Sequence, residues 1–215
     1  MSQLTHAPAA QLDTKRAGAV AGLVAGPVFL AAVAANTWAS IDFLRSLGWQ
    51  LVGGKNIPWP SSLAAGPYGW LQITAFFVAG CLIVLFAQGL RRALPARRSA
   101  VVAVVALTIA GLAIAASAFP VDAAMIETGD PSTWHGWIHG VAFLVALPSI
   151  LFAPVATALA LRGDRHWRPF GWLCVAATPV MLALLLLPLG NAGFYLFLTT
   201  AFGWIFALAA RLRHP

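Results

Sequence analysis

Charged residues are scarce in this sequence. Aspartate, glutamate, lysine and arginine make up 9% of the 215 residues, and apolar residues make up 60%. A soluble domain carries about 25% charged residues, because its surface must face water. A chain so poor in charge cannot cover a globule of this size with polar groups, and this excludes an ordinary soluble protein. The net charge of +7 falls in short runs between apolar stretches. That pattern is typical of helix flanks and not of a nucleic-acid groove, so no nucleic-acid partner is expected.

Cysteine and the common catalytic motifs are also scarce or missing. The two cysteines, Cys81 and Cys174, lie inside apolar stretches, so small buried side chains are predicted and a disulfide framework is not. The sequence has no G-x-S-x-G element and no Walker or dinucleotide fingerprint. No charged residue lies deep in an apolar stretch, which argues against an ion-coupled pump.

Long apolar stretches dominate the chain. A helix needs about 20 apolar residues to cross the hydrocarbon core of a bilayer. Six stretches approach this length: 17–39, 68–90, 100–119, 137–161, 170–189 and 193–211. The last two are read as a tight hairpin around Gly190, although one long kinked element is an alternative.

The six stretches predict an all-α, polytopic six-helix membrane bundle. The first stretch is too long for the roughly 7–15-residue apolar core of a signal peptide, so a retained helix is expected. We therefore predict a single transmembrane domain at 17–211, between an N-terminal tail at 1–16 and a C-terminal tail at 212–215. The lipid bilayer is the expected partner.

Arginine and lysine predict the orientation. Eleven cations fall on one side of the predicted spans: Lys15, Arg16, Arg91, Arg92, Arg97, Arg98, Arg162, Arg165, Arg168, Arg211 and Arg213. Only Arg45 and Lys55 fall on the other side. The positive-inside rule then places both termini in the cytoplasm, in a multi-pass protein of the cell membrane. Six tryptophans flank the outer side and are read mainly as interfacial anchors: Trp38, Trp49, Trp59, Trp70, Trp134 and Trp137.

Two further features bear on assembly. Gly18, Gly22 and Gly26 repeat at a spacing of four and share one helix face. This face predicts close helix packing inside the chain or, as an alternative, a homodimer. The long connection at 40–67 is large enough to cap the outer end of the bundle, and 41–47 within it could form a short amphipathic turn.

A cluster of ionisable residues near the outer surface is the strongest candidate for chemistry. Asp122 follows the third span, and His135 and His139 open the fourth at a spacing that places them on one helix face. With Asp42 as a further member, the residue types fit zinc or another divalent metal, which would activate a water molecule. Without metal, Asp122, His135 and His139 are candidate acid/base groups, with Asp42 and Glu127 as secondary candidates.

A structural interpretation of the same cluster stays open. In it, Asp122 caps a helix, His135 is an interfacial polar residue, and His139 packs inward against Asp122 or a backbone carbonyl. A polar ligand-binding site without chemistry is a third interpretation. Further polar residues fall near the same depth and predict interhelical hydrogen bonds or, together, a pocket that opens outward: Asn36, Thr37, Gln72, Ser117 and Asn191.

Several short elements resemble one known family. They are Asp42-Phe43-Leu44 with Leu47-Gly48, Gly66-Pro67-Tyr68-Gly69-Trp70-Leu71-Gln72, Phe119-Pro120-Val121-Asp122 and His135-Gly136-Trp137-Ile138-His139. The sequence from about 17 to 210 is similar to a bacterial and archaeal membrane family defined only as a domain of unknown function, DUF998. The resemblance implies a multi-helix membrane bundle and no particular activity.

Three functions follow as hypotheses. The first is a membrane-embedded metal-dependent or acid/base enzyme that acts on a lipid-like substrate through Asp122, His135 and His139. The second is a non-catalytic binding or transport protein for a small hydrophobic molecule. The third is an accessory membrane subunit, in which the face formed by Gly18, Gly22 and Gly26 would be buried against another chain.

Overall fold

The computed structural model describes residues 7–53, 57, 59–94, 97–162 and 167–213. These residues form eight α-helices and one short 3-10 helix, and they contain no strand. The elements are α1 (Ala7–Ala39), α2 (Ile41–Ser46), η1 (Ser61–Ala65), α3 (Gly69–Ala93), α4 (Arg98–Ala116), α5 (Ala123–Thr128), α6 (Trp134–Leu161), α7 (Arg168–Leu186) and α8 (Asn191–Arg213). Six of these helices are long and apolar enough to cross a membrane, which confirms the predicted all-α, six-helix membrane bundle.

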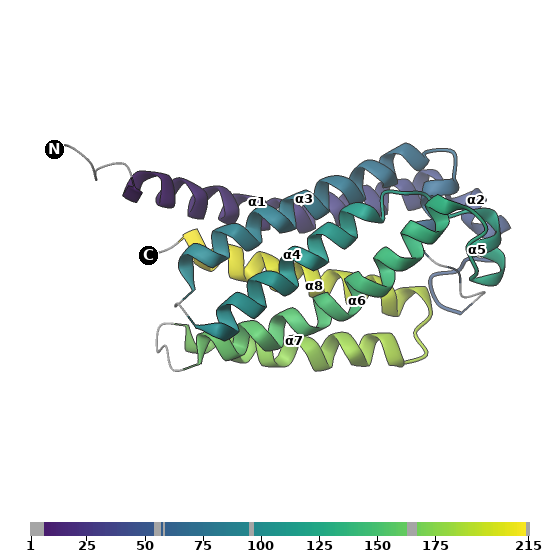
Figure 1. The fold of residues 1–215 in the computed structure, drawn as a ribbon. Helices are drawn as coiled ribbons and strands as arrows, with labels where there is room; N and C mark the ends of the chain where they lie inside the picture. Colours follow the sequence, from purple (N-terminus) through teal and green to yellow (C-terminus); the bar gives the residue numbers. More distant parts are fainter. Residues whose placement is uncertain (1–6, 54–56, 58, 95–96, 163–166, 214–215) are drawn as a thin grey trace.

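The six long helices pack in a closed ring. In ring order, α1 contacts α3, α3 contacts α4, α4 contacts α6, α6 contacts α7, α7 contacts α8, and α8 returns to α1. The start of α1 and the end of α8 lie at one end of the bundle, and α2 and α5 lie at the opposite end (Figure 1). That opposite end is called the distal end below. The cations Lys55 and Arg165 and the tail residues 1–6 and 214–215 lie outside the described residues.

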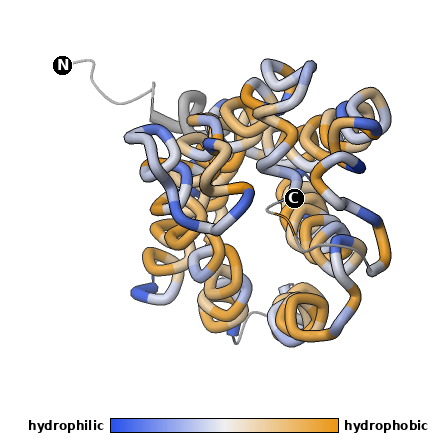
Figure 2. Tube along the Cα trace, turned by 90° about the vertical axis from the view of Figure 1, so that its right-hand side faces the viewer, coloured by the Kyte–Doolittle hydropathy of each residue, from blue (hydrophilic) through white to orange (hydrophobic). Residues whose placement is uncertain are grey.

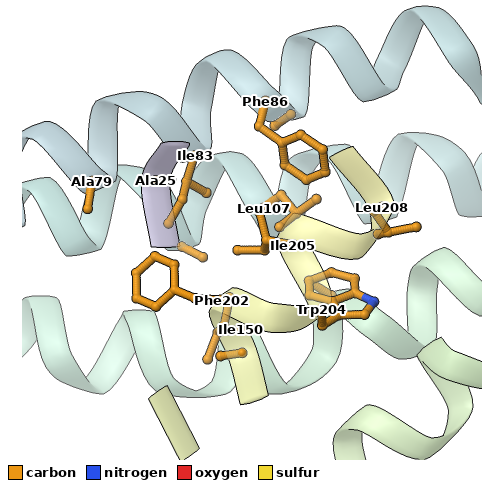
Figure 3. Packing of buried hydrophobic residues seen from close by; sticks show 14 of the residues in the cluster. Ala25, Ala79, Ile83, Phe86, Leu107, Ile150, Phe202, Trp204, Ile205 and Leu208 are labelled. Carbon is orange, nitrogen blue, oxygen red and sulfur yellow. The ribbon is translucent and has the colours of Figure 1, made fainter. Parts of the chain in front are cut away.

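The polar and apolar surfaces are arranged as a membrane protein requires. Viewed along the bundle, the helices are mostly hydrophobic and the hydrophilic stretches gather in the connections (Figure 2). Large apolar side chains are exposed on the outer faces of the helices, for example Leu144, which is 71% exposed. The centre holds a core to which Ile83, Ile150, Phe202 and Ile205 contribute from three different helices (Figure 3). Helix α7 is the least buried span, with 17% of its most apolar window inside the bundle.

The glycine face of α1 packs inside the chain. A Cβ atom on Gly18 would lie 2.5 Å from the Cα atom of Gly89 in α3, and one on Gly26 would lie 2.9 Å from the Cβ atom of Phe202 in α8. Gly22 is likewise covered by Phe86 of α3 and Ala209 of α8. The prediction of helix packing within the chain is confirmed. The alternative, a homodimer through Gly18, Gly22 and Gly26, stays a prediction for which the geometry offers no support, because α3 and α8 cover that face.

The connection between α1 and α3 covers the distal end of the bundle. The side-chain amide of Asn191 donates to the Gln50 carbonyl at 2.7 Å, and Ala192 N donates to the Leu51 carbonyl at 2.8 Å. These bonds fasten the connection to the turn between α7 and α8, so the predicted cap and the short helix within it, α2, are confirmed.

Two of the predicted tryptophan anchors belong to this cap instead of the membrane surface. Trp49 and Trp59 are only 8% and 5% exposed, and their rings lie 6.0 Å apart. Trp59 also packs against Tyr195 of α8. Trp49 and Trp59 are therefore core residues of the cap and not interfacial anchors, which leaves four of the six tryptophans as candidates. Trp38, Trp70, Trp134 and Trp137 are all largely exposed, as an anchor must be: 83%, 66%, 67% and 60%.

The close contact between α3 and α4 generates a first prediction. A Cβ atom on Gly80 would clash with backbone atoms of Gly111 and Ala115, and backbone cannot move aside as a flexible side chain can. We expect Gly80→Ala to destabilise the protein by about 1–3 kcal/mol, the usual cost of overpacking. The control is Gly203→Ala, because nothing lies within 4 Å of that position. Thermal unfolding in detergent measures both, and equal melting temperatures would contradict the predicted close contact.

Candidate functional site

Asp122 precedes α5 and connects it to the start of α6 through hydrogen bonds. Its Oδ1 accepts a hydrogen bond from the Met125 backbone N at 2.8 Å, which caps the N-terminus of α5. Its Oδ2 accepts from the backbone N atoms of Ser132 and Thr133, each at 2.9 Å, and from the Thr133 hydroxyl at 2.8 Å. Thr133 in turn accepts from Gly136 N and so caps α6. One carboxylate therefore fixes the starts of two helices.

The surroundings of Asp122 keep it ionised. The hydrogen bond from Met125 N is the largest influence on its pKa and lowers it, burial raises it, and the bonds from Thr133 and Ser132 lower it further. The net effect holds the pKa of this carboxyl well below its ordinary value of 3.8. Gly136 leaves room for the carboxylate, because a Cβ atom there would collide with Asp122 Oδ2. The geometry supports the structural interpretation of Asp122 as a cap.

Both histidines of α6 are oriented by consecutive backbone carbonyls. The Nδ1 atom of His135 lies 2.9 Å from the Pro120 carbonyl oxygen, and the Nδ1 atom of His139 lies 2.8 Å from the Phe119 carbonyl oxygen. A carbonyl oxygen can only accept, so we infer that each Nδ1 carries a hydrogen and donates it. In the neutral imidazole, the Nε2 atom is then an acceptor.

The Nε2 atom of His139 accepts a hydrogen bond from a residue in a distant part of the chain. Its Nε2 atom lies 2.9 Å from the hydroxyl oxygen of Ser61, the first residue of η1. Given the tautomer, Ser61 donates the hydrogen. His139 is 2% exposed and its ring meets the ring of Phe76 edge to face, with centroids 6.0 Å apart. The Ser61–His139 pair is therefore held from three sides: by Phe119, by Phe76 and by the capping connection.

This pair lies in the wall between two cavities. The inner cavity, about 80 Å³, runs into the ring of helices and has an apolar lining to which Phe29, Ile83, Ile114, Ile150, Phe197 and Phe202 belong. The outer cavity, about 700 Å³, lies under the cap and is lined in part by Trp59, Met125, Leu184, Pro188 and Asn191. Four residues line both cavities: Ser61, His139, Phe143 and Phe194. Of the residues that suggested an outward pocket, Ser117 lines the inner cavity and Asn191 the outer one, whereas Asn36, Thr37 and Gln72 line neither.

The predicted metal ligands do not come together. Among the residues that the structure describes, no three histidine, cysteine, aspartate or glutamate side chains are placed to hold one ion. The oxygens of Asp122 are occupied by four hydrogen bonds, and the exposed Asp42 lies in the first turn of α2. Glu127 is exposed on α5. The zinc site stays a prediction for which the geometry offers no support.

Two features of the candidate site were not predicted from the sequence. Ser61 lies 78 residues from His139, and a serine in a loop carries no periodic signal. The predicted interhelical hydrogen bond of Gln72 is wrong, because its side chain is fully buried and neither its oxygen nor its nitrogen has a partner among the described residues. It lies one helical turn from Phe76, which lines the inner cavity. Asn36, by contrast, donates to the Tyr68 carbonyl and accepts from Ser40, as predicted for an interhelical polar residue.

Comparison with known proteins identifies the family. A family model described as a protein of unknown function (DUF998) matches residues 60–213. The chain belongs to the DUF998 family. The matched range holds Ser61, Asp122, His135 and His139 and begins after α1. No curated protein and no solved structure matched the chain. The resemblance to DUF998 noticed in the sequence is confirmed, and the site residues of this DUF998 protein rest on its own geometry.

The cap role of Asp122 generates a second prediction. Asp122→Asn places an amide NH₂ where one of the two carboxylate oxygens now accepts, so we expect a lower melting temperature at pH 7. Because the folded pKa is lowered, the stabilisation is complete above the ordinary value of 3.8 and fades as pH falls toward the folded value. Thermal unfolding from pH 7 to pH 3 should show wild type and variant converging. The neighbouring exposed change Glu127→Gln is the control.

The buried amide of Gln72 generates a third prediction. A buried polar group without a partner costs about 1–3 kcal/mol, and Gln72→Met keeps a similar shape while removing the polar atoms. We therefore expect Gln72→Met to raise the melting temperature by a few degrees, at roughly 2–4 °C per kcal/mol for a chain of this size. A lower melting temperature would mean that the amide is satisfied in the folded protein.

Proposed function

We propose that this DUF998 membrane protein binds an amphiphile with an apolar chain, which it takes up at the distal end of the bundle. The observation that carries the proposal is the pair of adjoining cavities. The outer cavity is mixed in polarity and the inner one is almost wholly apolar. A molecule with one polar and one apolar end can therefore place its apolar end in the inner cavity and its polar end in the outer one. The proposal selects the second predicted function, a binding protein for a hydrophobic molecule.

The sizes of the cavities support this kind of ligand. About 700 Å³ lies within the range of roughly 300–1,000 Å³ that ligand sites occupy. The inner cavity of about 80 Å³ has room for several groups the size of a water molecule, at about 10–15 Å³ each. Its aromatic and aliphatic lining gives a water molecule few partners, whereas the end of an apolar chain needs none.

The polar groups are placed to hold the other end of the ligand. Ser61 and His139 lie at the boundary of the two cavities, and Asn191 lies in the wall of the outer one. No carboxylate lines either cavity among the described residues. A hydroxyl, ester or amide group therefore suits this boundary better than an ammonium group, which would lack a counter-charge.

The location in the cell is part of the same proposal. The cationic ends of the long helices lie at the end of the bundle that also carries both termini (Figure 1). The positive-inside rule then supports cytoplasmic termini and a distal end on the outer side of the cell membrane. In that orientation, the ligand comes from the outer leaflet or from outside the cell.

Filling the cavity generates a fourth prediction. Ala146 lines the inner cavity on α6, whereas Leu144, two residues earlier, is 71% exposed on the outer face of the same helix. Ala146→Trp should fill the inner cavity and lower lipid retention at least about tenfold, which corresponds to about 1.4 kcal/mol. Leu144→Trp should leave lipid retention unchanged.

Native mass spectrometry provides the measurement. The protein is released from nanodiscs of phosphatidylethanolamine and phosphatidylglycerol, and the lipids that stay bound are counted and identified. We expect one acyl-chain lipid on the wild type and on Leu144→Trp. Equal retention by wild type and Ala146→Trp, with both folded by thermal unfolding, would overturn the proposed binding site.

A further inference from the structure

We infer that Ser61 is a nucleophile activated by His139, and that this protein cleaves or transfers the acyl group of a long-chain ester. The inference rests on the proposed binding function, which brings the ester to the pair. It deepens that function, because the same boundary that would hold the polar end of a ligand carries two side chains arranged for acyl transfer.

The first argument is the geometry of the pair. A serine hydroxyl becomes a nucleophile when a base stands within about 2.6–3.2 Å and a third group orients that base. Ser61 Oγ and His139 Nε2 are 2.9 Å apart, and the Phe119 carbonyl holds His139 Nδ1 at 2.8 Å. The carbonyl fixes the tautomer in which Nε2 is free to take the serine proton.

The second argument is placement. A serine–histidine hydrogen bond that only fastens a loop can lie anywhere, but this one lines two cavities at once. The acyl chain of an ester in the inner cavity would leave its carbonyl group at the boundary, next to Ser61. The larger outer cavity would hold the alcohol portion and, later, water. Figure 3 shows Ile150, Phe202 and Ile205, which line the inner cavity, among the side chains packed at the centre of the bundle.

The third argument concerns Asp122. A carboxylate is the usual third member of such a site, and Asp122 is one of the predicted acid/base groups. Here its two oxygens accept four hydrogen bonds from Met125, Ser132 and Thr133, so a backbone carbonyl takes the orienting position instead. A neutral carbonyl stabilises an imidazolium ion less than a carboxylate does. We therefore expect a slow acyl-transfer enzyme.

The reaction balances with the groups present, the ester and water. Ser61 Oγ gives its proton to His139 Nε2 and forms a bond to the ester carbonyl carbon. The bond from that carbon to the alcohol oxygen then breaks, and the leaving alkoxide takes the proton from Nε2. Water repeats the cycle: it gives a proton to Nε2 as its oxygen adds to the acyl carbon, the bond from that carbon to Ser61 Oγ breaks, and Nε2 returns the proton to Oγ. An acceptor alcohol in place of water would complete a transfer.

Covalent labelling tests the inference. Dodecyl fluorophosphonate carries an apolar chain and reacts with activated serines: the serine oxygen bonds to phosphorus, fluoride leaves, and the proton goes to the base. With the full chain in nanodiscs, we expect one adduct by intact-protein mass spectrometry, mapped to Ser61 by peptide sequencing. Ser61→Ala, which removes a single oxygen atom, should abolish it. Ser62→Ala is the matched control, because Ser62 is fully buried beside Ser61 and lines neither cavity.

A second variant distinguishes a general-base role of His139 from a purely structural one. His139→Asn keeps an amide donor near the Phe119 carbonyl but has no atom at the Nε2 position, so the label should form at least about 100-fold more slowly, the lower end of a general base's contribution. In the wild type, the labelling rate should rise with pH as His139 loses its proton, whereas the variant should show no such rise. A purely structural hydrogen bond would give no such profile.

The outcomes distinguish the two proposals. Selective labelling of Ser61 that depends on His139 supports the inference. Retained lipid without labelling of Ser61, or equal labelling of wild type and Ser61→Ala, overturns the nucleophile and leaves the binding function standing. If the wild type retains no lipid, the binding function is overturned, and the inference about Ser61, which rests on it, is overturned with it.

Discussion

Two backbone carbonyls in the segment that follows α4 govern the arrangement of the site. This segment is not helical, so partly buried carbonyls in it need donors from other parts of the chain, because an unpaired polar group away from water is costly. Phe119 and Pro120 receive theirs from the Nδ1 atoms of His139 and His135. This pairing fixes the position of α6 against α4 and the tautomer of each ring. The Nε2 atom of His139 therefore faces Ser61 and the cavities.

The packing of the helix ring bears on where the cavities beside His139 lie. Small residues bring α1 and α3 into backbone contact at Gly18 and Gly89, and α3 and α4 at Gly80 and Gly111. On the opposite side of the ring, Gly193 of α8 likewise approaches the backbone carbonyl of Leu184 in α7, but α7 is still the least buried of the described spans and lies beside α6 and α8. The outer cavity lies beside this least buried span, since Leu184 and Leu185 of α7 line it, and the capping connection carries Ser61 to the same cavity.

The residues of the site that carry a local sequence signal could be predicted, and those brought together by distant contacts could not. The spacing of His135 and His139 correctly predicted one helix face, and Asp122 was correctly considered as a cap, because both signals are local. The predicted metal ligands do not lie together. The sequence could not show that the Asp122 carboxylate would accept four hydrogen bonds from neighbouring residues. Ser61 could not be found at all, since it reaches His139 only after the connection between α1 and α3 folds over the bundle.

The sequence by itself determined six helices long and apolar enough to cross a membrane, because apolar length is a local property and lipid leaves the backbone no alternative to a helix. It also determined membership of the DUF998 family. Only the tertiary structure decided the order of the helices in the ring, the burial of the glycine face within the chain, and the pairing of Ser61 with His139. Each of these depends on contacts between residues far apart in the chain, which no local pattern records.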